Sequence, residues 1–268
     1  MLKTGIQDNA LIEIKMIRNY SEKIKEMILC IETATNICSA SLCDSAGVIS
    51  TKESVDAKSH ASLLTVYIGE LFKDAGISAT DLKAVAVSKG PGSYTGLRIG
   101  VSVAKGIAFG ASLPLIGVAT TLSMTMGLIQ TIEKVDENTL FCPMIDARRM
   151  EVYNALYDHS GKQIKEISAD IITESSFDEI PEKCKIVFFG DGAAKCSGVI
   201  KRQNIEFFDN FSLSSAFMYK PVKEAFELKH FEDVAYFEPF YLKDFVATTQ
   251  KKNIFEEIGS KNVVNKNK

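Results

Sequence analysis

An internal repeat sets narrow limits on how this chain can fold. When Ile31 is placed over Ile145 without any gap, acidic, apolar and glycine positions coincide at one constant offset. The matched pairs are Glu32 with Asp146, Leu42 with Leu156, Asp44 with Asp158, and Gly47 with Gly161. Chance matching of common residues is the alternative, but several matches at a single offset favour a duplicated unit.

Each copy is predicted to open with three strands. The first copy is predicted to continue with a helix at 59–75, a strand at 82–87 and a helix at 95–111, and the second with a strand at 185–189 and helices at 193–200 and 213–228. A crossover helix implies parallel pairing of the strands that it joins, whereas hairpin strands pair antiparallel. The predicted fold class is therefore α/β, with two mixed-sheet halves arranged as in actin, the sugar kinases and the heat-shock ATPases.

Changes in composition divide the chain into four segments. Residues 1–26 are charged and only weakly periodic, and the strand pattern begins at Met27, so we interpret them as an N-terminal extension or an upstream start. The first half is predicted over 27–130 and the second over 131–250. Residues 251–268 are rich in Lys, Asn and Glu and are predicted to be a disordered tail.

Composition bears on partners and on location. The chain has 268 residues, 46% of them hydrophobic, and a net charge of −3 with no prominent run of Lys or Arg. A protein that grips RNA by itself usually carries a basic footprint, so work on RNA would need a partner. No apolar stretch reaches the roughly 18 residues of a membrane helix. The six cysteines form no C-x-x-C pair, and free thiols in a reducing cytoplasm are expected rather than a disulfide framework.

A glycine-rich run at 90–100, GPGSYTGLRIG, lies between a predicted strand and a predicted helix. Its Gly-Pro-Gly start predicts a tight turn, and the hydroxyl of Ser93 or Thr95 is suited to capping the helix. The run lacks the Gly-Lys-Ser/Thr ending of a P-loop and is not a G-x-G-x-x-G motif. From these residues alone it is either a structural turn or a loop that binds a ligand or partner.

Four strings together resemble the TsaB (YeaZ) family. They are 28–35 ILCIETAT, 90–100 GPGSYTGLRIG, 145–153 IDARRMEVY and 239–243 PFYLK, within a similarity that runs from about Met27 to Phe245. The resemblance implies the same duplicated fold. It also implies a role as the non-catalytic partner in the bacterial machinery that makes threonylcarbamoyladenosine at position 37 of transfer RNA.

Proteins of this fold hold a nucleotide between their halves, where acidic turns with glycines bind metal and phosphate. Here Glu32 and Asp146 supply the acids, but no glycine follows either of them. Arg148 and Arg149 stand where a phosphate would need bare backbone, although an arginine pair could instead attract an anion or face a partner.

A third turn in the second half keeps Gly190 and Gly192 on either side of Asp191. It is either a vestige of the adenosine site or a turn in which Asp191 caps a helix. We therefore predict a vestigial nucleotide cleft formed by Glu32, Asp146, Gly190 and Gly192.

Neither a metal site nor a catalytic residue is predicted. No two of His60, His159 and His230 lie within one helical turn, and Ser93 has no histidine within local reach. Two other functions remain open. An active ATPase or small-molecule kinase of this fold would need both acids to bind metal, and a glycoprotease-like metal peptidase would need bound zinc or iron.

The two helices of the first half carry an apolar surplus. Gly96, Gly100, Ala104, Ala108 and Ser112 form a stripe of small residues, which packs either on the chain's own sheet or on a second helix. The predicted partner interface consists of Leu64, Ile68, Leu71, Phe72, Leu97, Arg98, Val101, Ala104, Lys105 and Ala108.

The family resemblance also implies specific partners. It implies pairing with the catalytic subunit TsaD, a homodimer when TsaD is absent, recruitment of the P-loop ATPase TsaE, and contact with tRNA only through the complex. It implies no cofactor bound by this chain alone, and leaves open a nucleotide at the partner interface.

Overall fold

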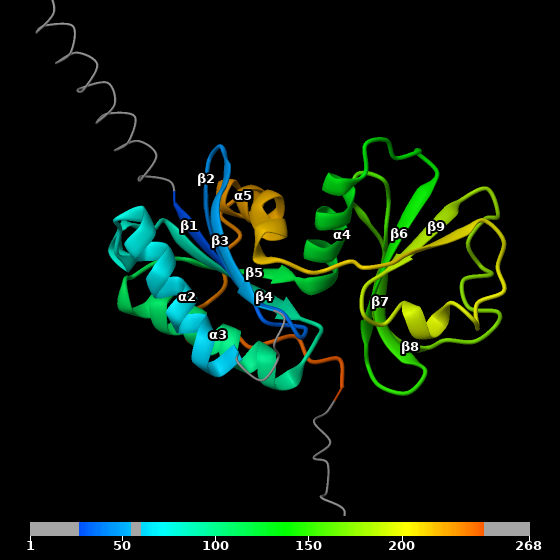
Figure 1. The fold of residues 1–268 in the computed structure, drawn as a ribbon, viewed down its shortest axis with the longest axis horizontal. Coiled ribbons are helices and arrows are strands. Elements are labelled where there is room, and N and C mark those ends of the chain that lie inside the picture. Colours follow the sequence, from blue (N-terminus) through cyan, green and yellow to red (C-terminus); the bar gives the residue numbers. More distant parts are fainter. Residues whose placement is uncertain (1–26, 55–59, 244–268) are drawn as a thin grey trace, which may run out of the picture.

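The computed structural model describes residues 27–54 and 60–243 and shows two similar halves side by side (Figure 1). Each half contains a five-stranded mixed sheet, in the order β3-β2-β1-β4-β5 and β8-β7-β6-β9-β10. The two orders are equivalent when each half is numbered from its own first strand, so the predicted duplication and the α/β fold class are confirmed. The predicted N-terminal extension and the tail from residue 251 lie outside the described residues.

The first sheet is built around a hairpin and two parallel crossovers. Its strands are β1 (Ile28–Glu32), β2 (Cys38–Asp44), β3 (Gly47–Ser54), β4 (Ala84–Gly90) and β5 (Leu115–Ala119). Strand β1 pairs antiparallel with β2 and parallel with β4, as the crossover helix predicts. Helices α2 (His60–Ala75) and α3 (Tyr94–Gly110) cover its outer face, and a short 3-10 helix, η2 (Ala79–Asp81), precedes β4. The side chain of His60 lies outside the described part of the chain.

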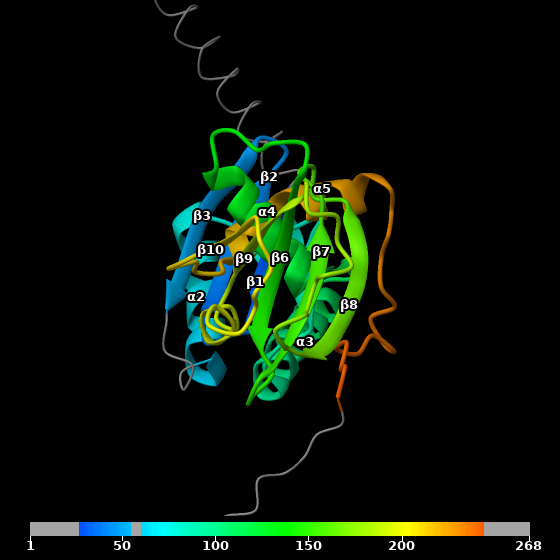
Figure 2. The same ribbon diagram turned by 90° about the vertical axis from the view of Figure 1, so that its right-hand side faces the viewer.

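The second sheet repeats this plan, as Figure 2 shows with β8 and β10 at opposite edges. Its strands are β6 (Thr139–Asp146), β7 (Glu151–Tyr157), β8 (Gln163–Ile171), β9 (Lys185–Phe189) and β10 (Ile205–Phe208). Where the first half has helices, its outer face carries turns and the short 3-10 helix η3 (Ala194–Cys196). The helix predicted over 193–200 is therefore wrong. Gly198 lies within the segment, and a glycine inside a helix disfavours it by about 1 kcal/mol relative to alanine.

The halves exchange helices across their junction. Helix α4 (Thr120–Thr131) packs on the second sheet through Met124 and Leu128, although it precedes that sheet in the sequence. In return, η4 (Ser215–Met218) and α5 (Tyr219–Glu227) pack on the first sheet through Met218 and Val222. A single cut near residue 130 therefore does not separate the packing of the two halves. The predicted helix over 213–228 is present only as the η4 and α5 pair.

After α5 the chain remains on the first half. The N–H of Glu232 donates to the Leu115 carbonyl at 2.8 Å, and Phe237 packs into the outer core beside α3. Among the described residues, no helix is long and apolar enough to cross a membrane.

The small residues of α3 pack against the turn that follows β1. A Cβ atom at Gly96 would lie 2.0 Å from the Thr33 carbonyl oxygen, and one at Gly100 would lie 2.2 Å from Thr33 Oγ1. That hydroxyl donates to the Gly96 carbonyl at 2.8 Å. Of the two interpretations of the stripe, packing within the chain is correct for these residues.

We expect Gly100→Ala to destabilise the chain by about 1–3 kcal/mol, because the added methyl overlaps a buried hydroxyl in a filled core. Gly106→Ala in the same helix is the matched control, since open space surrounds that position. It should stabilise the chain by up to about 1 kcal/mol through helix propensity. Urea unfolding of the two variants measures both effects, and equal stabilities would contradict the packing argument.

Candidate functional site

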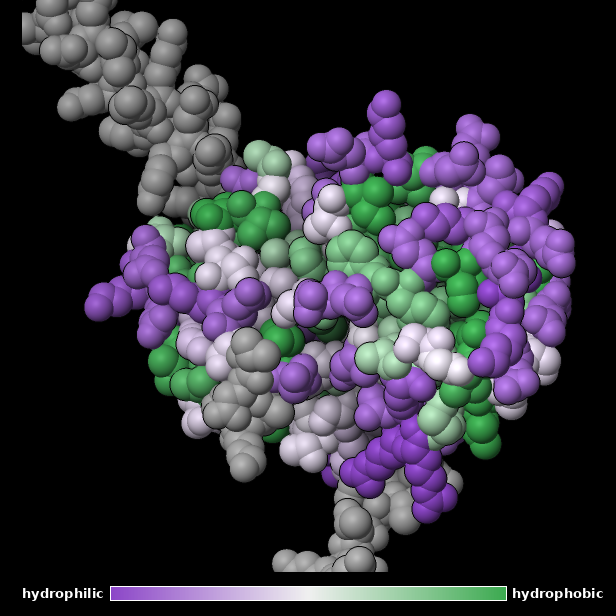
Figure 3. Space-filling view, turned by 45° about the vertical axis from the view of Figure 1, so that its right-hand side comes forward, coloured by the Kyte–Doolittle hydropathy of each residue, from purple (hydrophilic) through white to green (hydrophobic). Residues whose placement is uncertain are grey.

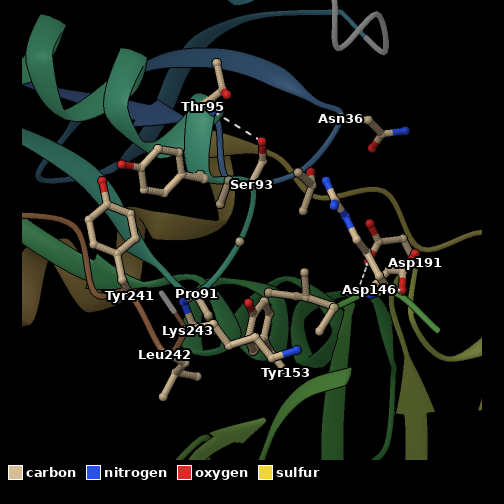
Figure 4. Close-up of a pocket in the computed structure, with 18 of the residues that line it drawn as sticks. Asn36, Pro91, Ser93, Thr95, Asp146, Tyr153, Asp191, Tyr241, Leu242 and Lys243 are labelled. Atoms are coloured by element: carbon tan, nitrogen blue, oxygen red, sulfur yellow. Dashed lines mark hydrogen bonds between the residues drawn. The ribbon is translucent and has the colours of Figure 1, made fainter. Parts of the chain in front are cut away.

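A cavity of about 770 Å³ opens between the two halves, and segments far apart in the sequence line it (Figure 4). The lining comes from residues 34–36 after β1, 91–96 at the start of α3, 145–149 at the end of β6, and 240–243 near the described C-terminus. These segments belong to the four strings that carry the family resemblance. The resemblance is therefore concentrated at one place in the structure.

The carboxylate of Asp146 lines this cavity and is already neutralised. Its Oδ1 contacts the Lys195 ammonium and accepts the Arg148 N–H at 2.9 Å, while Lys195 also donates to the Glu151 carbonyl at 2.7 Å. Partial burial alone would raise the pKa of Asp146, but the bonds from Lys195 and the Arg148 N–H hold it below the usual value. Lys195 thus supplies the positive charge that a metal ion would supply at this turn.

Glu32 does not reach the cavity. Its side chain is fully buried, Oε1 accepts the Ala34 N–H at 2.7 Å, and Oε2 has no hydrogen-bond partner. Burial raises the pKa of Glu32 to about 7, although the Ala34 N–H opposes the rise. The equivalence of Glu32 and Asp146 in the repeat therefore holds for the backbone position and not for the environment of the two carboxyl groups.

The space beside the two glycines predicted for the cleft is filled by the chain's own backbone. A Cβ atom at Gly190 would lie 2.4 Å from the Met144 carbonyl oxygen, and one at Gly192 would lie 2.9 Å from the Ile145 carbonyl carbon. Neither glycine lines the cavity. Both are required for close packing between the β9 turn and β6, so they do not offer bare backbone to a phosphate.

Asp191 links two turns of the site. Its Oδ1 accepts the Asp146 N–H at 3.0 Å, and its burial raises its pKa above the usual value. It precedes η3 without being its N-cap, a position taken by Ala193. We predicted Asp191 either as part of a vestigial adenosine site or as a helix cap. Neither prediction included the bond to Asp146, because the two residues lie 45 positions apart in sequence.

Arg148 and Arg149 form the tip of the β6–β7 turn. Both have left-handed backbone, with φ of 73° and 52°, and both side chains are exposed at the cavity. Across the described part of the chain, neither guanidinium makes a hydrogen bond or an ion pair. Arg148 contacts Asp146 only through its main-chain N–H, and its side-chain charge acts on that carboxylate without an ion pair.

The segment 240–243 closes one side of the cavity and contacts both halves. The Tyr241 ring lies 5.0 Å from the Tyr94 ring, and Arg98 donates to the Tyr241 hydroxyl at 3.3 Å. At the other end, Lys243 forms an ion pair with Glu151 of β7. Neither these contacts nor the pairing of Lys195 with Asp146 could be predicted from the sequence, since each joins residues far apart along the chain.

Most of the predicted partner interface lies in the core of the first half. Seven of its ten side chains are buried against the chain's own sheet: Leu64, Ile68, Leu71, Leu97, Val101, Ala104 and Ala108. Phe72 is half-buried against the same core, and Lys105 donates to the carbonyls of Ala235 and Phe237. That prediction chose the inward faces of α2 and α3. Val66 (48% exposed) and Phe109 (81% exposed) lie on the outward faces.

A protein-family model described as "TsaD: tRNA N6-adenosine threonylcarbamoyltransferase" matches residues 47–258. The chain belongs to this family. A structure titled "YeaZ from Pseudomonas aeruginosa" superposes with a TM-score of 0.69 at 21% identity, covering 81% of this chain and all of that one. This likeness shows that the two share a fold.

The curated relatives include proteins named TsaB and proteins named as threonylcarbamoyltransferases. The tRNA threonylcarbamoyladenosine biosynthesis protein TsaB of Escherichia coli is 38% identical over 50% of this chain and 57% of its own length. The TsaB of Haemophilus influenzae is 32% identical over 47% of this chain and 51% of its own. The tRNA N6-adenosine threonylcarbamoyltransferase of Halalkalibacterium halodurans is 36% identical over 35% of this chain and 32% of its own. The matches thus span about half the length of the TsaB relatives, and they confirm the predicted resemblance to the TsaB (YeaZ) proteins.

The buried Glu32 carboxyl predicts a pH-dependent stability. Because its pKa is about 7 in the folded chain and 4.5 in the unfolded chain, the unfolded chain loses this proton first as the pH rises. The contribution of this group is therefore greatest below pH 4.5 and is lost between pH 4.5 and about 7. Relative to Glu32→Gln, the wild type should lose about 3 kcal/mol across that interval.

Chemical denaturation of both proteins at a series of pH values measures this difference. Glu166→Gln, at an exposed position, is the matched control and should follow the wild type at every pH. A stability difference between wild type and Glu32→Gln that does not change with pH would contradict the assignment.

Proposed function

We propose that this chain takes part in threonylcarbamoyladenosine biosynthesis on tRNA as a non-catalytic subunit that holds a TsaD-type transferase in its active arrangement. The names of its curated relatives support the pathway. The observation that carries the non-catalytic role is the state of the two acidic turns. Lys195 forms an ion pair with the carboxylate of Asp146, and the side chain of Glu32 is buried in the core. Neither carboxyl group is therefore free to hold a metal ion.

The same observation weighs against the two other candidate functions. An ATPase or kinase of this fold needs open acidic turns beside glycines that admit phosphate, and here the glycines are packed against the chain's own carbonyls. Within the described residues, no group of three or more His, Cys, Asp or Glu is placed to hold a metal ion, as a metal peptidase would require.

We further propose that the outward faces of α2 and α3 pair with the transferase. This chain and the transferases belong to one family, and partners of similar fold can associate about a pseudo-twofold axis using equivalent elements. Phe109 and Val66 supply exposed apolar area there, and open space beside Gly106 and Gly110 allows a partner helix to approach closely. A homodimer would use the same faces in the absence of the transferase. TsaE, and a nucleotide at the interface, would join the assembled pair.

The role as a required but non-catalytic subunit predicts a specific result in reconstitution. Transferase, P-loop ATPase, threonylcarbamoyl-adenylate, ATP and tRNA should yield modified adenosine only when this chain is added. Activity should survive the double variant Glu32→Gln with Asp146→Asn, because neither carboxyl takes part in the chemistry. Mass spectrometry of digested tRNA measures the product. Activity without the chain, or its loss in a folded double variant, would overturn the role.

The proposed pairing surface predicts that Phe109→Asp weakens association with the transferase by at least about tenfold, since a charge would be buried in an apolar contact. Ile171→Asp is the matched control, because Ile171 is 70% exposed on β8, an edge strand of the second sheet that is not part of the proposed surface. Titration calorimetry measures the affinities, and circular dichroism verifies that both variants fold. Equal affinities for the two variants would exclude this surface.

A further inference from the structure

The arginine pair at the tip of the β6–β7 turn has no structural use that requires arginine. Both residues have left-handed backbone, which costs roughly 1–2 kcal/mol for a residue with a Cβ and is better tolerated by glycine or asparagine. The turn itself is held by main-chain groups: the Ala147 N–H donates to the Glu151 carbonyl, and the Glu151 N–H donates to the Arg148 carbonyl. The choice of arginine at both positions therefore indicates a use for the guanidinium groups outside the turn.

The acidic groups of the cavity do not neutralise these arginines. Asp146 is paired with Lys195, Glu151 is paired with Lys243, and Asp191 accepts the main-chain N–H of Asp146. When Lys195 is included, four positive groups (Arg148, Arg149, Lys195 and Lys243) stand against three carboxyl groups (Asp146, Glu151 and Asp191), so the local charge balance is positive. This local excess occurs although the chain as a whole is acidic, with a net charge of −3. Figure 3 shows hydrophilic side chains gathered over much of the second half, to which the turn belongs.

Flat aromatic rings line the same cavity as the arginines. Figure 4 shows Tyr153, from β7, on one side of the cavity and Tyr241 on another, and the Tyr241 ring lies 5.0 Å from the ring of Tyr94. Asn36 and Ser93 add polar side chains to the facing wall. Arginines for phosphate and aromatic rings for unpaired bases are the combination that binds single-stranded RNA.

The same features argue against a free nucleotide as the natural ligand. The phosphates of a nucleotide held between the halves would need the glycine turns, and those turns are filled by the carbonyls of residues 34, 144 and 145. The free donors lie instead at the exposed tip of a hairpin, where the phosphates of a passing strand can reach them. Because only unpaired bases can stack on tyrosine, a single-stranded segment fits better than a duplex.

We propose that Arg148 and Arg149 bind phosphates of a single-stranded RNA segment, with Tyr153 stacking on one of its bases. The proposal extends the function proposed above, and rests on it for the presence of RNA, by assigning this chain a direct contact in a complex otherwise expected to bind tRNA through its partner. Two phosphate contacts give weak binding alone, with a Kd on the order of 10⁻⁴ M for the isolated chain.

The test uses the full chain and a fluorescein-labelled 12-nucleotide single-stranded RNA, measured by fluorescence anisotropy at several salt concentrations. Arg148→Ala with Arg149→Ala should weaken binding at least about tenfold and lower the salt slope by about 1.4, near 0.7 for each lost contact. Lys183→Ala with Lys201→Ala removes the same charge from exposed positions outside the cavity and should leave binding unchanged. Tyr153→Leu should weaken binding several-fold, and Tyr153→Phe should not.

Three results would overturn the proposal: no binding by the wild type, equal losses in the arginine and lysine double variants, or competition by AMP as effective as that by the RNA. The last would assign the cavity to a free nucleotide. The reconstitution assay separates this proposal from the function on which it rests. Modification that requires the chain but persists in a chain that does not bind RNA would leave the function standing and refute the RNA site.

Discussion

The contact between the turn after β1 and the first turns of α3 determines much of this structure. Thr33 touches both Gly96 and Gly100, and the Ser93 N–H donates to the Ala34 carbonyl at 2.6 Å. No side chain larger than hydrogen fits at either glycine, so the helix lies directly on the strand end. This contact positions the glycine-rich turn, directs the carboxyl of Glu32 into the core, and fixes one wall of the cavity between the halves.

Close packing of this kind changes what the cavity can do. The space beside a glycine turn can hold either a phosphate or a neighbouring segment of backbone. In both halves of this chain it holds backbone. The carboxylate of Asp146 needs no metal ion from solution, because the side-chain ammonium of Lys195 neutralises its charge. The glycine turns that phosphate would need, and the carboxylate that a metal ion would need, are thus occupied by the protein's own groups. The rim of the cavity remains accessible to a ligand.

The sequence predicted the parts of this structure that depend on local pattern. The repeat anchored on Ile31 and Ile145 predicted the duplicated sheet, and the periodicity of α2 and α3 predicted both helices close to their observed limits. It could not decide which face of α3 turns inward, because Leu97, Val101 and Ala104 suit a core as well as an interface. The pairing of Lys195 with Asp146 and the exchange of α4 and α5 depend on contacts between distant residues, which one sequence without its fold does not reveal.

The two arginines show how a departure from local preference can indicate function. The β6–β7 turn adopts left-handed backbone at Arg148 and Arg149, where most side chains are disfavoured, and neither guanidinium group makes a hydrogen bond or an ion pair with the residues that the structure describes. Buried departures such as Glu32 are offset by the surrounding packing and affect mainly the stability of the fold. An exposed departure at the mouth of a cavity has no such surroundings, so the compensating interaction has to come from outside the chain. A phosphate satisfies the charge and the exposed position of this pair, and the tyrosines that line the same cavity make a nucleic-acid strand its natural source.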